Sequence, residues 1–299
     1  MKSHSDFNGW IYSFKTITGF AAILGQIPEV CPFTLGNDTV MSFLRRFQTF
    51  PDPTQQFIVE IEKQILKHDS EHHTCGKSFI CEVLSGRSTS KDQESEHAEA
   101  TNILFETFFA AAAEIAVTLG TVFYCLLTNF DAYERLVAIL RAPTWPKSLE
   151  LTPEKAAYLE SLRLYPSYSP PMERIVPSQG IEAGGYHIPA GNIVSVPQYM
   201  AHRDVSIFGE DIEVFRPERW FEADESSLRR MENNFLAFGK GTGVCVGRDL
   251  AMLEIRSCLF GLLQRFDFEL VSKKPLPRIT MYWMLDHVNF KVCLSHACK

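Results

Sequence analysis

Cys245 ends the glycine-rich loop Phe238-Gly239-Lys240-Gly241-Thr242-Gly243-Val244-Cys245, and a cysteine thiolate is a good metal ligand. Three glycines at alternate positions allow the backbone to turn tightly. Gly247, two residues after the cysteine, has no Cβ, so the main chain there can approach a flat ring closely. These residues predict an axial thiolate ligand for heme iron. The alternative is an ordinary glycine-rich turn before a core helix.

The residues after this loop predict the helix that positions it. Apolar side chains recur at the spacing of a buried helix face, at Ala251, Ile255, Cys258, Leu259, Leu262, Leu263 and Phe266. Cys245 would then lie just before a helix N-terminus, where the dipole and the loop amides favour thiolate over thiol. Ala251 is small where the ring would lie.

The spacing around Cys245 resembles the cysteine loop of the cytochrome P450 family. That pattern has Phe seven residues before the ligand, Gly four before it and Gly two after it, as at Phe238, Gly241 and Gly247. The resemblance implies heme b as the cofactor, with Cys245 as the axial ligand of its iron. It assigns cofactor binding to Phe238, Gly239, Gly241, Cys245, Gly247 and Ala251. Most members carry a basic residue for a heme propionate two positions before the cysteine, where this chain has Gly243.

Glu160 and Arg163 lie three residues apart in a helix-like segment that Pro166 would end, so their side chains can pair. Alone, such a pair is usually a solvated surface pair worth a few tenths of a kcal/mol. The segment Phe215-Arg216-Pro217-Glu218-Arg219-Trp220 resembles the family's Phe-x-Pro-Glu-Arg segment. The resemblance implies that Arg219 joins Glu160 and Arg163 in a structural triad behind the cysteine loop.

Arg174 begins a segment, Arg174-Ile175-Val176-Pro177, that resembles the family's strand with an arginine for a heme propionate. It is therefore the candidate to replace the missing basic residue at Gly243. The run from Tyr186 to Val196 has turn residues between β-rich pieces and predicts a hairpin. The segment Ala201-His202-Arg203-Asp204 resembles the family's His-Arg segment, and His202 is not expected to bind iron.

The stretch from Thr107 to Leu127 is almost wholly apolar and about long enough to span a membrane. Glu114 near its centre argues against a span, because an ionised carboxylate is costly there. In the family, an acid occupies this place in the long helix on the distal face of the heme, so Glu114 and the next residue are candidate catalytic positions. The family's threonine, whose hydroxyl orders water for proton delivery, is replaced by Ile115. Thr118 lies three residues further on and could share that face.

Composition indicates a globular chain, with 45% hydrophobic and 22% charged residues in 299. A net charge of -7 does not indicate nucleic-acid binding, which usually requires a basic surface. The polar start of the chain has no features of a signal peptide. Eight cysteines without a framework spacing suggest reduced thiols inside a cell.

The N-terminal part carries weaker signals. Residues 6–24 and 39–50 are expected to be helical, and Thr54 is a plausible N-cap for a helix over 55–67. A zinc site can be drawn from His68, His72, His73, Cys75 and Cys81, although their spacing fits no compact finger.

The motifs that carry the resemblance lie between about residues 101 and 267. The resemblance implies a mainly α fold with small β-sheets. It further implies that the chain is the C-terminal portion of a fungal-style, reductase-dependent cytochrome P450. Residues 1–100 would form an incomplete helical region on the substrate-roof side, and 101–299 the heme-binding core. The family's membrane anchor and first helices have no counterpart here. Association with the endoplasmic reticulum membrane is therefore expected only of anchored, full-length relatives, and this chain is expected to be intracellular.

Three functions fit these residues. The first is a heme-thiolate monooxygenase that inserts one atom of dioxygen into a small lipophilic substrate, with electrons from NADPH through a reductase. The second is an oxygen-independent enzyme that rearranges or dehydrates an already oxygenated substrate, for which a threonine at 115 matters little. The third is an inactive truncated member of the family.

Overall fold

The computed structural model describes residues 33, 37, 39–40, 42–43, 53–70, 79–85, 93–142, 152–168, 170–271, 277–281 and 284–297. Contacts divide the chain into two compact units, Met1–Ala113 and Glu114–Lys299. The functional division at residue 100 stays a prediction.

The first unit contains helices α3 (Pro53–Ser70) and α4 (Phe79–Ser85) and the start of α5 (Gln93–Thr128). Ile61, Ile65 and Leu104 form its small core. Helix α3 begins at Pro53, so Thr54 lies within the first turn and the expected N-cap is wrong. A proline is well tolerated at this first position, because its missing N–H would have no helical partner. The expected helix over 6–24 lies outside the described residues.

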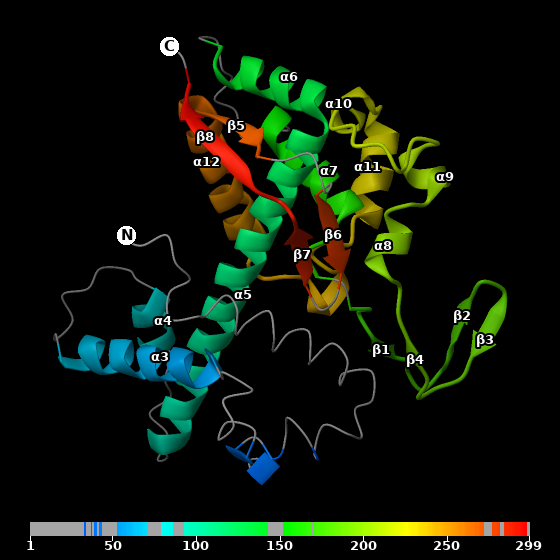
Figure 1. Ribbon diagram of the computed structural model, residues 1–299. Coiled ribbons are helices and arrows are strands. Elements are labelled where there is room, and N and C mark those ends of the chain that lie inside the picture. The colour runs from blue at the N-terminus through cyan, green and yellow to red at the C-terminus, as the bar shows by residue number, and fades with distance from the viewer. Residues whose placement is uncertain are drawn as a thin grey trace. The chain divides into compact units, whose positions relative to one another are not determined.

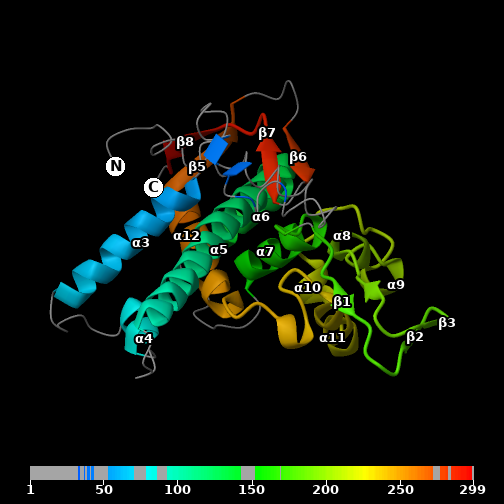
Figure 2. The ribbon, with the colours of Figure 1, turned by 90° about the horizontal axis from the view of Figure 1, so that it is seen from below.

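The second unit is mainly helical, which confirms the expected fold class. After α5, its longer helices are α6 (Phe130–Leu140), α7 (Pro153–Leu164), α11 (Glu225–Asn234) and α12 (Arg248–Arg265). Its short helices are α8 (Gln198–Ala201), α9 (Val205–Phe208), α10 (Arg219–Glu222) and the 3-10 turn η3 (Gly241–Gly243). Figures 1 and 2 show these elements from two directions.

The described residues of the second unit also form four small antiparallel sheets. They pair β1 (Arg174–Ile175) with β4 (Ile193–Val194), β2 (Ile181–Ala183) with β3 (Tyr186–Ile188), β5 (Phe266–Leu270) with β8 (Val292–His296), and β6 (Arg278–Met281) with β7 (Leu285–Val288).

The hairpin expected within residues 186–196 is wrong, because its two strands pair elsewhere. The hairpin is β2–β3, and it turns through Gly184 and Gly185, which have φ values of 59° and 83°. Two successive positive φ values suit a two-residue hairpin turn, and glycine adopts them without strain. This hairpin projects away from the helices of its unit (Figures 1 and 2).

One core holds the second unit together. Helix α7 is buried along almost its whole length and packs with α6 and α12. Helix α12 contributes Ile255, Leu259 and Leu263 at four-residue spacing, as the sequence predicts for this helix, although Cys258 is exposed. The last turns of α5 add Val122, Leu126 and their neighbours to the same core.

Within the described residues, one helix, His97–Thr128, is long and apolar enough to cross a bilayer by length and composition. A core helix passes the same test, and the end of this helix is part of the core.

Among the described residues, no group of three His, Cys, Asp or Glu side chains could hold a metal ion. Of the residues from which a zinc site could be drawn, His72, His73 and Cys75 lie outside the described residues. Cys125, Cys245, Cys258 and Cys293 are free thiols, whereas Cys81 is disulfide-bonded, contrary to the expectation of reduced thiols throughout.

Candidate functional site

The loop before Cys245 is held by its own backbone. Gly239 and Gly241 have φ values of 70° and 73°, which side-chain-bearing residues rarely adopt. The amide of Cys245 donates to the carbonyl of Phe238 at 2.8 Å, and the amide of Val244 donates to that of Gly241 at 3.2 Å. The two glycines therefore close the loop and bring the cysteine back beside Phe238.

The sulfur of Cys245 lies at an open position before helix α12. The residue is exposed, and Gly247 caps the N-terminus of the helix. A Cβ on Gly247 would lie 3.8 Å from the cysteine Sγ, at ordinary van der Waals distance, so Gly247 lies directly beside the sulfur. The amide of Ala251 donates to the carbonyl of Gly247 at 2.8 Å and starts the helical ladder.

Arg174 reaches this loop from strand β1. A Cβ on Gly243 would lie 2.7 Å from Nη2 of Arg174, closer than real Cβ contacts. The guanidinium therefore occupies the space of the absent side chain at position 243. Arg174 is exposed, and its Nη1 donates to the carbonyl of Glu173 at 2.8 Å.

Phe238 packs on the core side of the loop. Its ring lies 6.4 Å from that of Tyr158, which is buried on α7. Burial raises the pKa of Tyr158, and the charge of Cys245 adds to the effect. The phenol is therefore kept neutral, and it lies within electrostatic reach of the cysteine.

Glu160 and Arg163 form a fully buried, bidentate ion pair. Arg163 Nε donates to Glu160 Oε2 and Nη2 donates to Oε1, both at 2.9 Å. Neither side chain is exposed to solvent. A solvated surface pair is thus excluded for these two residues.

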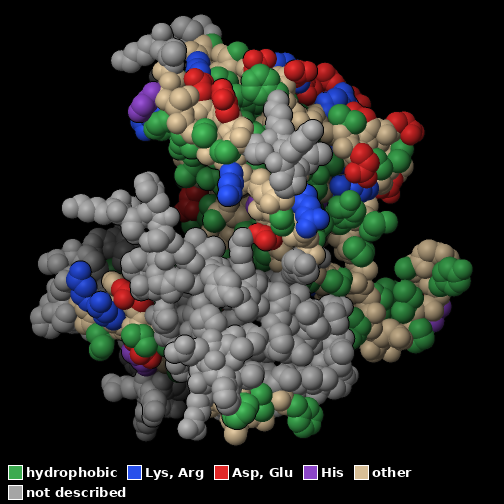
Figure 3. Space-filling model, in the orientation of Figure 1, with side chains coloured by type: hydrophobic (Ala, Val, Ile, Leu, Met, Phe, Trp, Pro, Cys, Tyr) green, Lys and Arg blue, Asp and Glu red, His purple; other side chains and the backbone are tan. Residues whose placement is uncertain are grey.

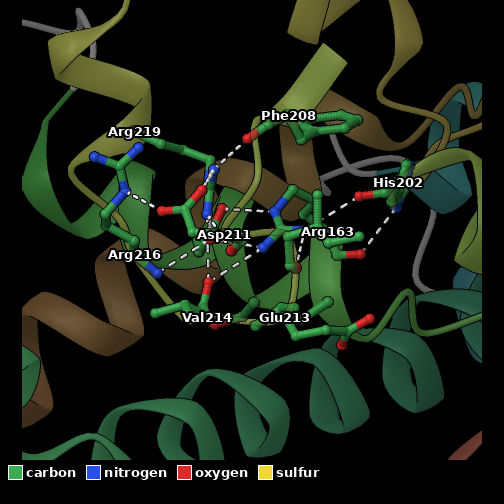
Figure 4. Close-up of polar contacts among 12 residues, drawn as sticks. Arg163, His202, Phe208, Asp211, Glu213, Val214, Arg216 and Arg219 are labelled. Atoms are coloured by element: carbon green, nitrogen blue, oxygen red, sulfur yellow. Dashed lines mark hydrogen bonds and ion pairs between the residues drawn. The ribbon is translucent and has the colours of Figure 1, made fainter. Parts of the chain in front are cut away.

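Arg219 joins the pair from α10. Its Nε donates to Glu160 Oε1 at 2.9 Å, and Trp220 Nε1 donates to Oε2 at 3.0 Å. Arg163 and Arg219 also share the carbonyl of Val214, at 3.3 and 3.4 Å (Figure 4). The carboxylate of Glu160 is thereby compensated by two cations, as a buried charge requires.

The surface offers a contrast to this network. Acidic and basic side chains intermix on the face that Figure 3 shows over α9 to α11. Exposed ion pairs in this part of the chain join Arg229 to Glu225 and Arg216 to Glu222. Exposed pairs of this kind contribute at most about 1 kcal/mol.

His202 is the residue whose importance the sequence does not reveal. Its ring is buried, with Nδ1 3.2 Å from the carbonyl of Arg163, and Nε2 accepts from the amide of Leu236 at 2.7 Å. Figure 4 shows it beside Arg163 at one end of the network. Burial lowers the pKa of His202 to about 4, and the charges of Arg163 and Arg203 act in the same direction.

Glu114 and Ile115 lie on helix α5. Glu114 is partly buried, and this burial raises the pKa of its carboxyl. The same carboxylate raises the pKa of Tyr168, whose own burial is the larger cause. Ile115 packs against the core of the second unit, and Thr118 is buried. Among the described residues, no hydrogen bond or ion pair joins Glu114 to the cysteine loop.

The site residues thus fall into three groups. The loop from Phe238 to Ala251 carries the exposed thiol, and Arg174 reaches this loop at Gly243. The triad is a separate buried network, and His202 connects it to the segment before the loop. Glu114 and Ile115 form the third group, on α5.

The family model described as Cytochrome P450 matches residues 15–294. The chain is 34% identical over 283 residues to "Cytochrome P450 monooxygenase mpaDE" of Penicillium brevicompactum, covering 89% of this chain and 32% of that protein. It is 36% identical over 176 residues to "Cytochrome P450 monooxygenase pkfB" of Emericella nidulans, covering 56% of this chain and 34% of that protein. The chain therefore spans about a third of the length of the curated relatives it matches.

Proposed function

Because the chain belongs to the cytochrome P450 family, we propose that it forms the heme-thiolate part of a monooxygenase, with Cys245 as the axial ligand of heme b. The observation that carries this proposal is the exposed thiol on a loop closed by Gly239 and Gly241, directly before a helix N-terminus. The names of the relatives above support monooxygenase chemistry.

The residues around Cys245 fit the chemistry of heme. The apolar side chains of Val244 and Val246, the two neighbours of Cys245 in sequence, are exposed, as expected where a large apolar ligand binds. Arg174 would supply a cation for a heme propionate. When bound, heme supplies dioxygen activation and the insertion of one oxygen atom into the substrate, and thiolate ligation favours cleavage of the O–O bond.

Within this proposal, the carboxyl of Glu114 would hold a proton for delivery to the heme site. Its raised pKa keeps the carboxyl protonated to higher pH than an ordinary glutamic acid, so it can act as a proton donor. Ile115 offers neither a donor nor an acceptor to pass that proton on. Proton delivery in this chain therefore lacks the hydroxyl that the family pattern provides.

The side chain of Ile115 favours a second candidate function, the rearrangement or dehydration of an already oxygenated substrate. Such chemistry needs neither dioxygen nor the ordered water of a threonine hydroxyl. The Ile115→Thr variant separates the two functions. If the chain is a monooxygenase, the variant assayed with NADPH and a reductase should release less hydrogen peroxide per NADPH consumed than the wild-type chain does. Turnover of a hydroperoxide without NADPH, unchanged by the substitution, would favour the second function.

We assign electron delivery to an NADPH-dependent reductase and the substrate class to small lipophilic molecules. Lys240 and Arg248 flank Cys245, are exposed, and would attract an acidic partner. Reversal of both charges should slow heme reduction and flatten its salt dependence. Equal reduction rates at low ionic strength would contradict this docking site.

The central experiment is the carbon monoxide difference spectrum of the reduced, heme-loaded chain. The expected spectrum has the Soret position of a thiolate complex, and Cys245→Ser should abolish it. Cys258→Ser is the matched control, because Cys258 is also an exposed free thiol on this part of the chain. An unchanged spectrum in Cys245→Ser would refute the ligand assignment. Failure of the chain to retain heme would favour an inactive truncated member.

A further inference from the structure

The hydrogen bonds of His202 fix which ring nitrogen carries the proton. The amide of Leu236 can only donate, so Nε2 of His202 must accept, across 2.7 Å. Nδ1 then carries the proton and donates to the carbonyl of Arg163 at 3.2 Å. The ring also stacks on Phe235, with centroids 5.1 Å apart and planes 8° from parallel. The imidazole is thus a donor at one end, an acceptor at the other, and has a fixed plane.

The donor end of the ring meets the buried triad. Arg163 Nη1 donates back to the carbonyl of His202 at 3.1 Å, while the same guanidinium holds Glu160. The side chain of each residue therefore bonds the main-chain carbonyl of the other. Among the described residues, no buried side-chain N or O atom of Glu160, Arg163 or Arg219 lacks a hydrogen-bond partner.

The acceptor end meets the segment that leads into the cysteine loop. The carbonyl of Leu236 accepts from the amide of Gly239 at 2.8 Å, and Gly239 is the first positive-φ glycine of the loop. Next to it, the carbonyl of Phe238 accepts from the amide of Cys245. A short series of hydrogen bonds therefore runs from Arg163 through His202 and Leu236 to the backbone of the cysteine loop.

We propose that His202 is a positioning residue, which transmits the fixed geometry of the buried triad to the backbone of the cysteine loop through its bond to the Leu236 amide. The inference rests on the proposed function in taking Cys245 as the heme ligand. Trp220 also connects the triad to this segment, because it bonds Glu160 and lies edge-on to Phe235 with centroids 5.6 Å apart. Ring packing alone does not direct a backbone N–H, whereas the acceptor at Nε2 does.

Two amide substitutions separate the two ends of the ring. In His202→Asn, the shorter side chain can place its NH2 near the position of Nδ1 and keep the bond to the Arg163 carbonyl. In His202→Gln, the longer side chain can place its oxygen near the position of Nε2 and keep the bond from the Leu236 amide. His187→Asn, on the exposed β2–β3 hairpin, is the control for loss of a histidine.

Hydrogen exchange of the heme-free chain tests the link directly. We expect the amides of Leu236 and Cys245 to exchange about fivefold faster in His202→Asn, as for the loss of one hydrogen bond. In His202→Gln and in the control they should exchange at the wild-type rates. Wild-type exchange at both amides in His202→Asn would overturn the proposal, even if that variant were less stable.

The carbon monoxide difference spectrum then tests the effect on the ligand. We expect the heme-loaded His202→Asn chain to lose part of the thiolate-type Soret band and the His202→Gln chain to keep it. A full band in both variants would overturn the positioning role. If the wild-type chain itself lacks the band, the proposed function fails, and exchange at the Cys245 amide alone decides whether His202 positions the loop.

Discussion

The guanidinium of Arg174 fills the space that a side chain at Gly243 would occupy, with Nη2 2.7 Å from the position of a Cβ. A basic residue at 243 and the observed conformation of Arg174 therefore exclude each other. The glycine in this otherwise family-like loop has a physical reason, because it admits a cation from strand β1 in place of one within the loop.

This exclusion predicts the effect of adding one methyl group. Gly243→Ala should displace the flexible end of Arg174 and weaken heme binding several-fold, with little loss of stability, because an exposed side chain can move aside. Heme titration of the apoprotein measures this. In an Arg174→Ala background the same substitution should have no further effect, since the group it displaces is gone. Additive losses in the double variant would show that the two positions act independently.

The triad predicts a large loss of stability on truncation. Arg163→Ala removes a bidentate partner from the buried Glu160 and should lower the free energy of unfolding by about 3 to 5 kcal/mol. Arg135→Ala is the control, because it breaks an exposed pair with Glu218 and should cost about 1 kcal/mol or less. Urea denaturation measures both. Equal small losses would mean that the buried pair contributes no more than a surface pair.

The lowered pKa of His202 predicts acid destabilisation. The folded-state pKa is about 4 against an ordinary value of 6.5, so between these pH values the unfolded chain binds a proton that the folded chain does not. Stability should therefore fall as pH falls through this window, by about 2 kcal/mol from pH 7 to pH 5. His202→Gln should remove this component of the pH dependence, which urea denaturation at the two pH values measures. Parallel pH profiles for the two proteins would contradict the assignment.

Glu114 predicts a gain of stability when its charge is removed. Because burial raises the pKa of this carboxyl, the folded state disfavours the carboxylate, and the penalty is present at pH 7 and absent below the ordinary pKa. Glu114→Gln should therefore raise the melting temperature at pH 7 and leave it nearly unchanged at pH 4. Glu106→Gln, at an exposed position on the same helix, should change neither. A gain of equal size at both pH values would point to a cause other than ionisation.

Several features of this protein could be predicted from the sequence because near neighbours determine them. The tight loop before Cys245 depends on Gly239 and Gly241, which reach positive φ at little cost. The apolar face of α12 follows from residues four apart, and the pairing of Glu160 with Arg163 follows from residues three apart. The family resemblance rests on the same local patterns.

Tertiary structure alone decided the features that join distant segments. Sequence spacing could not show that Arg174 occupies the space beside Gly243, or that His202 connects Arg163 with Leu236. The sequence also predicted the hairpin within residues 186–196, whereas the structure forms it between β2 and β3. Both the turn through Gly184 and Gly185 and the later turn residues are compatible with a hairpin, and local sequence does not choose between them. Local patterns specify the conformation of each segment, whereas contacts between segments depend on which faces the core buries together. That choice is made by packing over the whole chain, where a charge such as Glu160 becomes tolerable only once its distant partners surround it.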